Sequence, residues 1–392
     1  MRYAYPSPKS PRTTHVLIFA AILAIFVYGM TAALLGTILP DLSARFSLTP
    51  RQNGTIAAAQ AIGLMIASLG VGPLLDSQGD KIGLILGLIA IAIALIALPR
   101  ATGFGSIVLE LFLLGIGGGI VVTGANALAG AAASDHRAIA LNLVNLFFGL
   151  GGFATPFISA HVFKQKWTSV SYTVAAFALL TLAVHAVTPM PAPTAGSGFV
   201  FAQASAIFAQ PLLLLLGLFL FLYIACEVGI WNWLTRHLIA QGVPESKALN
   251  ILSFGFALGL LFGRVAVSPI LISVPPVQVT LWAAVGIAIT TFFMLRATKP
   301  VTAAILVFLA GLVMAPVFPT TLAIVGSSFP HFTATATGFA ITCGWAGLAL
   351  SSPIIGGIAG PDPKRLKKAL LILPAFALVM VAVNLAIQGA AR

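Results

Sequence analysis

Three side chains in one apolar stretch have the residue types and the spacing to bind a polyhydroxylated ring. Tyr223, Glu227 and Trp231 recur at i, i+4 and i+8 within residues 209–239, so they share roughly one face of a helix. A carboxylate accepts hydrogen bonds from two adjacent hydroxyls, and an aromatic ring packs against the apolar C–H face of a pyranose. We therefore expect this face, with Asn232 beside it, to bind a sugar-like molecule.

Glu227 is the main acidic group within the apolar segments. An unpaired charge at that depth costs about 2.5–3.5 kcal/mol, and such residues are usually functional. We interpret Glu227 as the leading substrate residue and as a candidate for proton coupling. The alternative is a structural glutamate that is protonated or paired with an arginine. Glu110, nearer the start of residues 104–133, is a second coupling candidate.

Other polar side chains inside the apolar segments could complete a pocket. Each alone could instead form a hydrogen bond between helices. Only convergence of several would indicate a binding site. These residues are Gln60, Asn126, Asn142, Asn145, Thr342 and Trp345.

Twelve apolar segments must position these groups, and a helix of about 20 apolar residues crosses a bilayer. The composition agrees, with 59% hydrophobic and 7% charged residues. The segments expected are 16–40, 52–75, 82–99, 104–133, 138–162, 168–190, 209–239, 247–273, 275–296, 298–327, 332–358 and 366–390. We expect Pro316 and Pro319 to unwind or kink the tenth segment.

The loop-like stretch PAPTAGS at residues 191–197 divides the chain into two groups of six helices. The sequence thus predicts an all-α integral membrane protein built as two pseudo-symmetric bundles. We expect an N-terminal tail at 1–15, a first bundle at 16–190, a central linker at 191–208 and a second bundle at 209–392.

The net charge of +12 comes from Lys and Arg at helix ends, where they meet lipid headgroups, so we expect no nucleic-acid partner. Both cysteines fall inside apolar helices, and no metal spacing or cofactor motif occurs. The N-terminal cluster of Arg2, Lys9 and Arg12 predicts cytoplasmic termini in a bacterial inner membrane, although the basic loop 362–368 argues the other way.

A GxxxDxxGxK pattern lies between the second and third segments, formed by Gly72, Asp76, Gly79 and Lys81. Glycines let two helix ends approach, and Asp76 can accept from a helix N-terminus or pair with a cation. We expect these residues, together with Arg264, to latch one conformation. The pattern resembles the loop signature of the major facilitator superfamily.

The second half is similar to the fucose–galactose–glucose/proton symporter family and its glucose/mannose-type relatives. The resemblance rests on residues 221–233, Leu261–Arg264, Ala315–Thr321 and Thr335–Gly338. It implies a monomer that moves a sugar, with or without protons, by alternating access. The acids that the family uses in its first and fourth helices are missing, because residues 35–40 read LGTILP and Val122 replaces a Glu.

The leading hypothesis is a secondary transporter of a hexose or similar neutral polyol, as a symporter or uniporter. The alternative keeps the fold and exports drugs or other amphipathic molecules. An organic-anion carrier is less favoured, because Arg264 is expected at the cytoplasmic end of its helix and no other Arg or Lys lies mid-helix. An enzyme is not expected, since no HExxH motif or Ser/His/Asp grouping occurs.

Overall fold

The computed structural model describes residues 11–164, 166–190, 206–297, 299–360 and 363–390. In these residues, twelve segments are helical, long and apolar enough to cross a membrane. The sequence-based prediction of an all-α, multi-pass membrane protein is thus confirmed. The predicted linker at 191–208 and tail at 1–15 fall largely outside the described residues, so that division stays a prediction.

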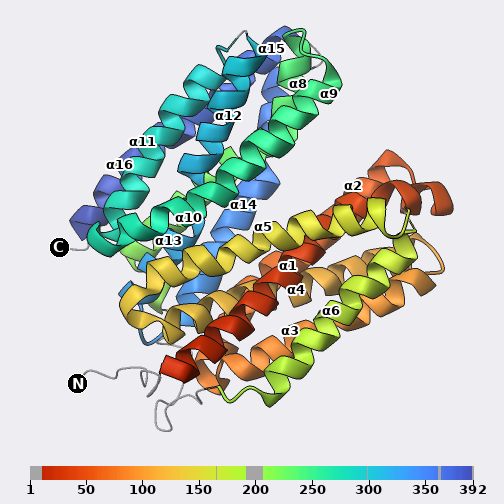
Figure 1. Ribbon diagram of the computed structural model, residues 1–392, viewed down its shortest axis with the longest axis vertical. Helices are drawn as coiled ribbons and strands as arrows, with labels where there is room; N and C mark the ends of the chain where they lie inside the picture. Colours follow the sequence, from red (N-terminus) through yellow and green to blue (C-terminus); the bar gives the residue numbers. More distant parts are fainter. Residues whose placement is uncertain (1–10, 165, 191–205, 298, 361–362, 391–392) are drawn as a thin grey trace. The chain divides into compact units, whose positions relative to one another are not determined.

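The chain forms two compact units. Unit 1 comprises the chain up to Ile207 together with Gly326–Thr342, and unit 2 comprises Phe208–Val325 and Cys343–Arg392. The first six spans belong to unit 1 (Figure 1): α1 (Pro11–Phe46), α2 (Pro50–Gln78), α3 (Asp80–Ala97), α4 (Phe104–Ala132), α5 (Arg137–His161) and α6 (Trp167–Val187). Short 3₁₀ turns, η1 (Leu98–Arg100) and η2 (Ser134–His136), follow α3 and precede α5.

The remaining helices contain two interrupted spans. They are α8 (Pro211–Ala240), α9 (Glu245–Asn250), α10 (Ala257–Ser273), α11 (Pro276–Met294), α12 (Pro300–Met314), α13 (Val317–Ser328), α14 (Thr333–Ala359), α15 (Pro363–Leu370) and α16 (Ile372–Ala390). A π-helical turn, η3 (Ile251–Phe256), joins α9 to α10 in the eighth span. The first ten residues of α14 belong to unit 1 and the rest to unit 2.

Proline affects two spans differently. The tenth span breaks between α12 and α13 at Ala315 and Pro316, as expected from a ring that cannot donate a hydrogen bond. In contrast, α1 continues past Pro40 to Phe46, beyond the predicted end of the first segment. Membrane helices tolerate an internal proline where neighbouring helices or local adjustments satisfy the freed backbone groups.

Small residues allow helix backbones to pack closely within each unit. In unit 1, a Cβ on Gly115 of α4 would collide with the backbone carbonyl of Gln60 in α2. In unit 2, Gly259 of α10 meets the carbonyl of Phe308 in α12 in the same way. Membrane helices associate largely through such close contacts, because lipid provides no hydrophobic drive between them.

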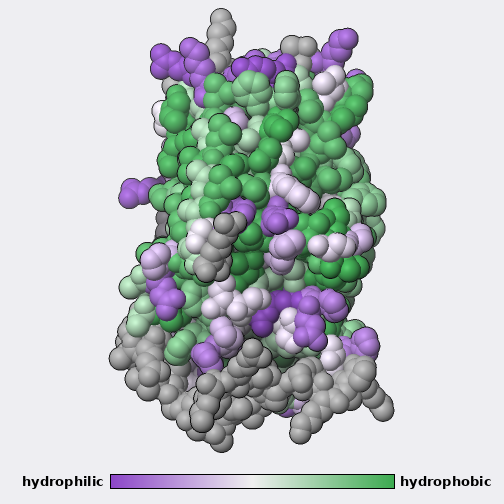
Figure 2. Space-filling view, turned by 90° about the vertical axis from the view of Figure 1, so that its left-hand side faces the viewer, coloured by the Kyte–Doolittle hydropathy of each residue, from purple (hydrophilic) through white to green (hydrophobic). Residues whose placement is uncertain are grey.

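The outward surface is suited to lipid. Large apolar side chains such as Leu109, Phe153, Ile272 and Leu378 are more than half exposed. Figure 2 shows hydrophobic residues over much of the visible surface, with hydrophilic residues gathered along its upper margin. Such a surface is expected for helices that face acyl chains and end among headgroups.

Candidate functional site

A cluster of Tyr223, Glu227 and Arg264 lies at mid-depth in unit 2. Tyr223 is twelve residues from the start of the 30-residue helix α8, about 18 Å along an axis of about 45 Å. Its side chain is 0% exposed, and its hydroxyl faces the Glu227 carboxylate. Arg264 of α10 is 7% exposed and interacts electrostatically with both residues. The acid is therefore balanced by a buried cation and is not isolated.

The position of Arg264 corrects the expectation that it lies at a helix end. It precedes the end of α10 at Ser273 by nine residues, about 14 Å. Its neighbour Gly263 allows close approach, because a Cβ there would collide with the Leu312 carbonyl of α12. An organic-anion carrier was disfavoured because the sequence indicated no cation in the middle of a helix. The buried guanidinium of Arg264 is such a cation.

The three residues of the cluster differ in exposure. Glu227 is partly exposed, whereas Tyr223 and Arg264 are buried. Trp231, one turn further along α8, is 37% exposed and packs edge-on against Phe256, with ring centroids 5.2 Å apart. The face predicted from the i, i+4, i+8 spacing therefore runs from a buried phenol to a partly open acid and an accessible indole.

Asn232 has a partner on another helix. Its amide nitrogen donates to the Ser352 hydroxyl of α14 at 2.8 Å, and the Trp233 indole approaches the same oxygen at 3.4 Å. This hydrogen bond between α8 and α14 accounts for Asn232 without a role in substrate binding.

Trp345 of α14 has an unused donor. The indole Nε1 is buried and has no hydrogen-bond partner among the described residues. Its neighbours Gly344 and Gly347 pack against Ile224 and the Phe221 carbonyl of α8, so this part of α14 lies level with Tyr223. A buried donor without a partner costs about 1–3 kcal/mol, so a ligand that accepted a hydrogen bond from this indole would be favoured.

Two of the three candidate asparagines of unit 1 are hydrogen-bonded to each other. Asn145 of α5 donates to the Asn126 side chain of α4 at 2.7 Å and to the Leu141 carbonyl at 2.9 Å. Asn126 donates to the Val122 carbonyl at 2.8 Å. Both side chains are less than 5% exposed. This pair joins α4 to α5 and leaves little capacity for a ligand.

The other unit 1 candidates are more dispersed. Asn142 is fully buried and donates to the Ala138 carbonyl at 2.8 Å. Thr342 donates to the Gly338 carbonyl at 2.8 Å and approaches the Met65 carbonyl of α2 at 3.3 Å. Gln60 is half-buried. Glu110 is also half-buried, and its Oε2 has no partner among the described residues.

Asp76 binds the N-terminus of α14 within unit 1. Its Oδ1 accepts from the Ala334 amide at 3.0 Å, and its Oδ2 accepts from the Thr335 amide at 2.8 Å and the Thr335 hydroxyl at 2.6 Å. A carboxylate at this position compensates exposed amides and the helix dipole. Gly72, one turn earlier, leaves no room for a Cβ beside the Thr335 backbone.

The other loop residues have separate tasks. Gly79 has φ 88°, a left-handed conformation that favours glycine, and it separates α2 from α3. Lys81 donates to the carbonyls of Ala186 at 2.7 Å and Thr188 at 3.1 Å at the C-terminus of α6. This cation thus compensates the negative end of a helix.

Sequence reasoning missed Arg137, which it placed in a loop. Arg137 begins α5, and its side chain packs against Gly130 of α4. Gly326, near the end of α13, leaves space for the guanidinium of Arg137, since a Cβ at Gly326 would collide with it. Arg137 therefore lies near a helix C-terminus, and Asp76 lies at the N-terminus that follows. The two opposite charges each compensate a helix dipole, and the sequence alone did not indicate that Arg137 and Gly326 lie together.

No group of three or more His, Cys, Asp or Glu side chains in the described part of the chain could hold a metal ion. The two cysteines are free thiols in α8 and α14.

Comparison with known proteins gives a family and a fold. The profile of the Major Facilitator Superfamily matches residues 21–352. The 4-hydroxybenzoate transporter PcaK of Pseudomonas aeruginosa is 27% identical over 155 residues, which are 39% of this chain and 34% of that protein. The match thus spans about a third of the length of this relative.

Two solved structures share the fold over almost the whole chain. The transporter FucP in the outward conformation has a TM-score of 0.84 at 18% identity, covering 96% of this chain and 99% of FucP. The human organic anion transporter MFSD10 has a TM-score of 0.78 at 14% identity, covering 96% of this chain and 100% of MFSD10. At these identities the likeness concerns the fold alone.

Proposed function

Because this chain belongs to the Major Facilitator Superfamily, we propose that it is a secondary transporter of a hexose or similar neutral polyol that works by alternating access. It functions as a monomer in the bacterial inner membrane, with both termini in the cytoplasm. Its transport class follows from the family, whereas the substrate depends on the residues of unit 2.

The cluster of Tyr223, Glu227 and Arg264 is the observation that carries the substrate proposal. Arg264 supplies a buried counter-charge, and Glu227 is the residue of the cluster that is partly exposed. A carboxylate held in this way accepts two neighbouring hydroxyls of a sugar ring. Trp231 provides an accessible ring for the apolar face of the sugar, and the unpartnered Trp345 donor lies level with Tyr223.

The test is the substitution Glu227→Gln in purified protein and in proteoliposomes. Loss of a hydrogen bond to a charged acceptor weakens binding by about 1.5–3 kcal/mol, or roughly ten- to 150-fold. Thermal stabilisation by a panel of hexoses would identify the ligand, and exchange of that labelled sugar would measure transport. Glu245→Gln, an equal change at an exposed residue, is the control. Unchanged sugar affinity in Glu227→Gln would refute this assignment.

A small aromatic carboxylate is a second candidate substrate. Two observations favour it: the mid-depth guanidinium of Arg264, and the partial similarity to the 4-hydroxybenzoate transporter. Arginine binds carboxylates in a bidentate geometry, and Trp231 offers a ring for stacking. Stabilisation by 4-hydroxybenzoate but not by 4-hydroxybenzamide or hexoses would select this candidate over the sugar. The reverse pattern would exclude it.

Proton coupling in this proposal involves Glu227, with Glu110 as the other acid within a span. Addition of substrate to proteoliposomes that have no imposed proton gradient or membrane potential should then alkalinise the external medium. This signal should disappear in Glu227→Gln and persist in Glu110→Gln. A substrate flux with no proton movement would make the protein a uniporter.

A further inference from the structure

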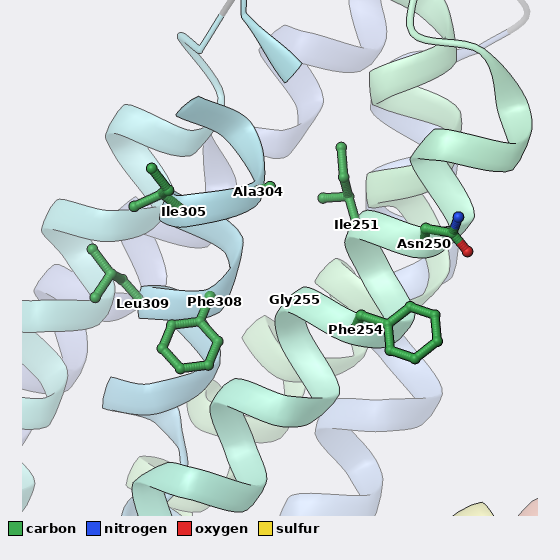
Figure 3. Close-up of a pocket in the computed structure, with 8 residues that line it drawn as sticks. All are labelled: Asn250, Ile251, Phe254, Gly255, Ala304, Ile305, Phe308 and Leu309. Carbon is green, nitrogen blue, oxygen red and sulfur yellow. The ribbon is translucent and has the colours of Figure 1, made fainter. Parts of the chain in front are cut away.

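An apolar groove opens on the surface of unit 2 between η3 and α12. Its volume is about 440 Å³. Figure 3 shows α12 on one side of the groove and the η3 turn on the other. The lining residues are Asn250, Ile251, Phe254, Gly255, Ala304, Ile305, Phe308 and Leu309. Asn250 is the polar member of this set.

The groove lies on the outer surface of unit 2, where several of its lining side chains are exposed. Phe254 is 65% exposed, Ile305 56% and Leu309 38%. Gly255 and Ala304 are small and leave room for the groove, and a Cβ on Gly255 would lie 3.2 Å from Val307. The π-helical turn provides Ile251, Phe254 and Gly255, and such turns often occur at functional sites in helices. In a bilayer, an apolar groove on the outer surface of a membrane helix is accessible to acyl chains.

Two lysines lie at the membrane-surface end of the groove. Lys247 precedes Asn250 by three residues and Ile251 by four, so it lies on the same helix face one turn above the groove. Lys299 immediately precedes α12. Both are exposed, and neither forms a hydrogen bond or ion pair with a described residue. The groove begins about 5 Å below Lys247 and extends to about 12 Å, the depth of acyl carbons below a headgroup.

The same end of unit 2 is basic beyond these two lysines. His237 of α8 contacts the Leu295 backbone and lies within electrostatic range of Lys367, so α8, α11 and α15 meet there. Glu245 is the acidic residue of this end among the described residues, and it lies two positions from Lys247, on a different helix face. The other exposed cations are Arg236, Arg296, Arg365, Lys367 and Lys368.

We propose that this groove is a specific site for an anionic phospholipid, with one acyl chain between η3 and α12 and the phosphate at Lys247 and Lys299. The two lysines favour an anionic headgroup, because each lysine near a membrane surface stabilises binding to anionic lipid by about 1 kcal/mol. The apolar lining decides that the ligand is a lipid and not a free phosphate. The groove shares no lining residue with the proposed substrate cluster, although Phe256 at the end of η3 packs against Trp231.

Native mass spectrometry of the purified full-length protein tests the proposal. Dioleoyl phosphatidylglycerol should bind about thirtyfold more tightly than dioleoyl phosphatidylcholine. The double variant Lys247→Gln/Lys299→Gln should lose this preference. The matched control Lys164→Gln/Lys166→Gln removes two exposed charges from unit 1 and should retain it. Equal affinities for the two lipids in the native protein, or equal losses in both double variants, would overturn the proposal.

A second variant tests the acyl-chain part of the site. Ala304→Phe fills the groove and should lower the binding of both lipids, while the thermal midpoint and elution volume report that the protein is folded. The free headgroup, glycerol 1-phosphate, should not displace the bound phosphatidylglycerol. Unchanged lipid binding in folded Ala304→Phe, or displacement by glycerol 1-phosphate, would refute the groove as the lipid site. The exposed lysine pair provides an independent result if Ala304→Phe does not fold.

Discussion

Replacing Asp76 with asparagine should release the N-terminus of α14 from α2. The carboxylate accepts three hydrogen bonds, of 3.0, 2.8 and 2.6 Å, from Ala334 and Thr335. An asparagine of the same shape keeps one oxygen acceptor and places an amide NH₂ opposite the remaining donors. The Thr335 amide then has no acceptor, and the negative charge at the helix terminus is lost.

The size of the effect follows from these contacts. A hydrogen bond to a charged group contributes about 1.5–3 kcal/mol, against about 0.5–1.5 kcal/mol for a neutral one. The charge–dipole interaction adds about 0.3–1 kcal/mol, and more where it is partly buried. We expect Asp76→Asn to weaken the contact by about 3 kcal/mol, a change of roughly 150-fold in the equilibrium between joined and separated helix ends.

Thiol accessibility measures this equilibrium directly. Ala334 is 2% exposed, so a cysteine there, in a protein with Cys226 and Cys343 replaced by serine, should react slowly with maleimide. Adding Asp76→Asn should raise the labelling rate by one to two orders of magnitude. The control Asp135→Asn makes the same chemical change at an exposed residue. A labelling rate that does not respond to Asp76→Asn, or responds equally to Asp135→Asn, would refute the reasoning.

Three further experiments test the interior of the two units. Arg264→Gln should lower the thermal midpoint strongly, because removing one partner of a buried charge pair costs about 3–5 kcal/mol, and adding Glu227→Gln should restore part of that loss. Trp345→Phe should leave the midpoint unchanged or slightly higher, since it removes an unpartnered donor, yet weaken substrate binding about tenfold if that donor serves the ligand. A double-mutant cycle of Asn126→Ala and Asn145→Ala should give a coupling of about 0.6–2 kcal/mol in unfolding assays, and a coupling of zero would contradict the paired amides.

Much of the helical framework was predictable from the apolar composition and from the charged residues, prolines and glycines that mark helix ends. Long apolar runs must form helices in lipid, because every backbone group has to be satisfied internally. Proline was a less reliable marker of helix ends. The break at Pro316 was predicted, whereas α1 passes through Pro40, so a proline alone does not determine where a membrane helix ends.

The candidate site was predictable only in part. The spacing of Tyr223, Glu227 and Trp231 indicated a shared face, and periodicity alone supports that inference. The partner of Glu227 could not be predicted, because Arg264 belongs to another helix and its depth depends on how α10 packs against α8. For the same reason the sequence left open whether Asn126 and Asn145, 19 positions apart, are ligands or hydrogen-bond partners between helices, and the structure shows that they bind each other.

The sequence by itself determined that this protein spans the membrane many times, carries an acid within its seventh span and has an aspartate suited to a helix N-terminus. These conclusions need only local pattern and the solvation of single groups. Only the tertiary structure decided that Arg264 lies beside Glu227, that Asp76 binds the N-terminus of α14 and that two lysines lie at one end of an apolar groove. Contacts between helices depend on rotation and depth of each helix, which small residues set through close packing and which no linear pattern specifies.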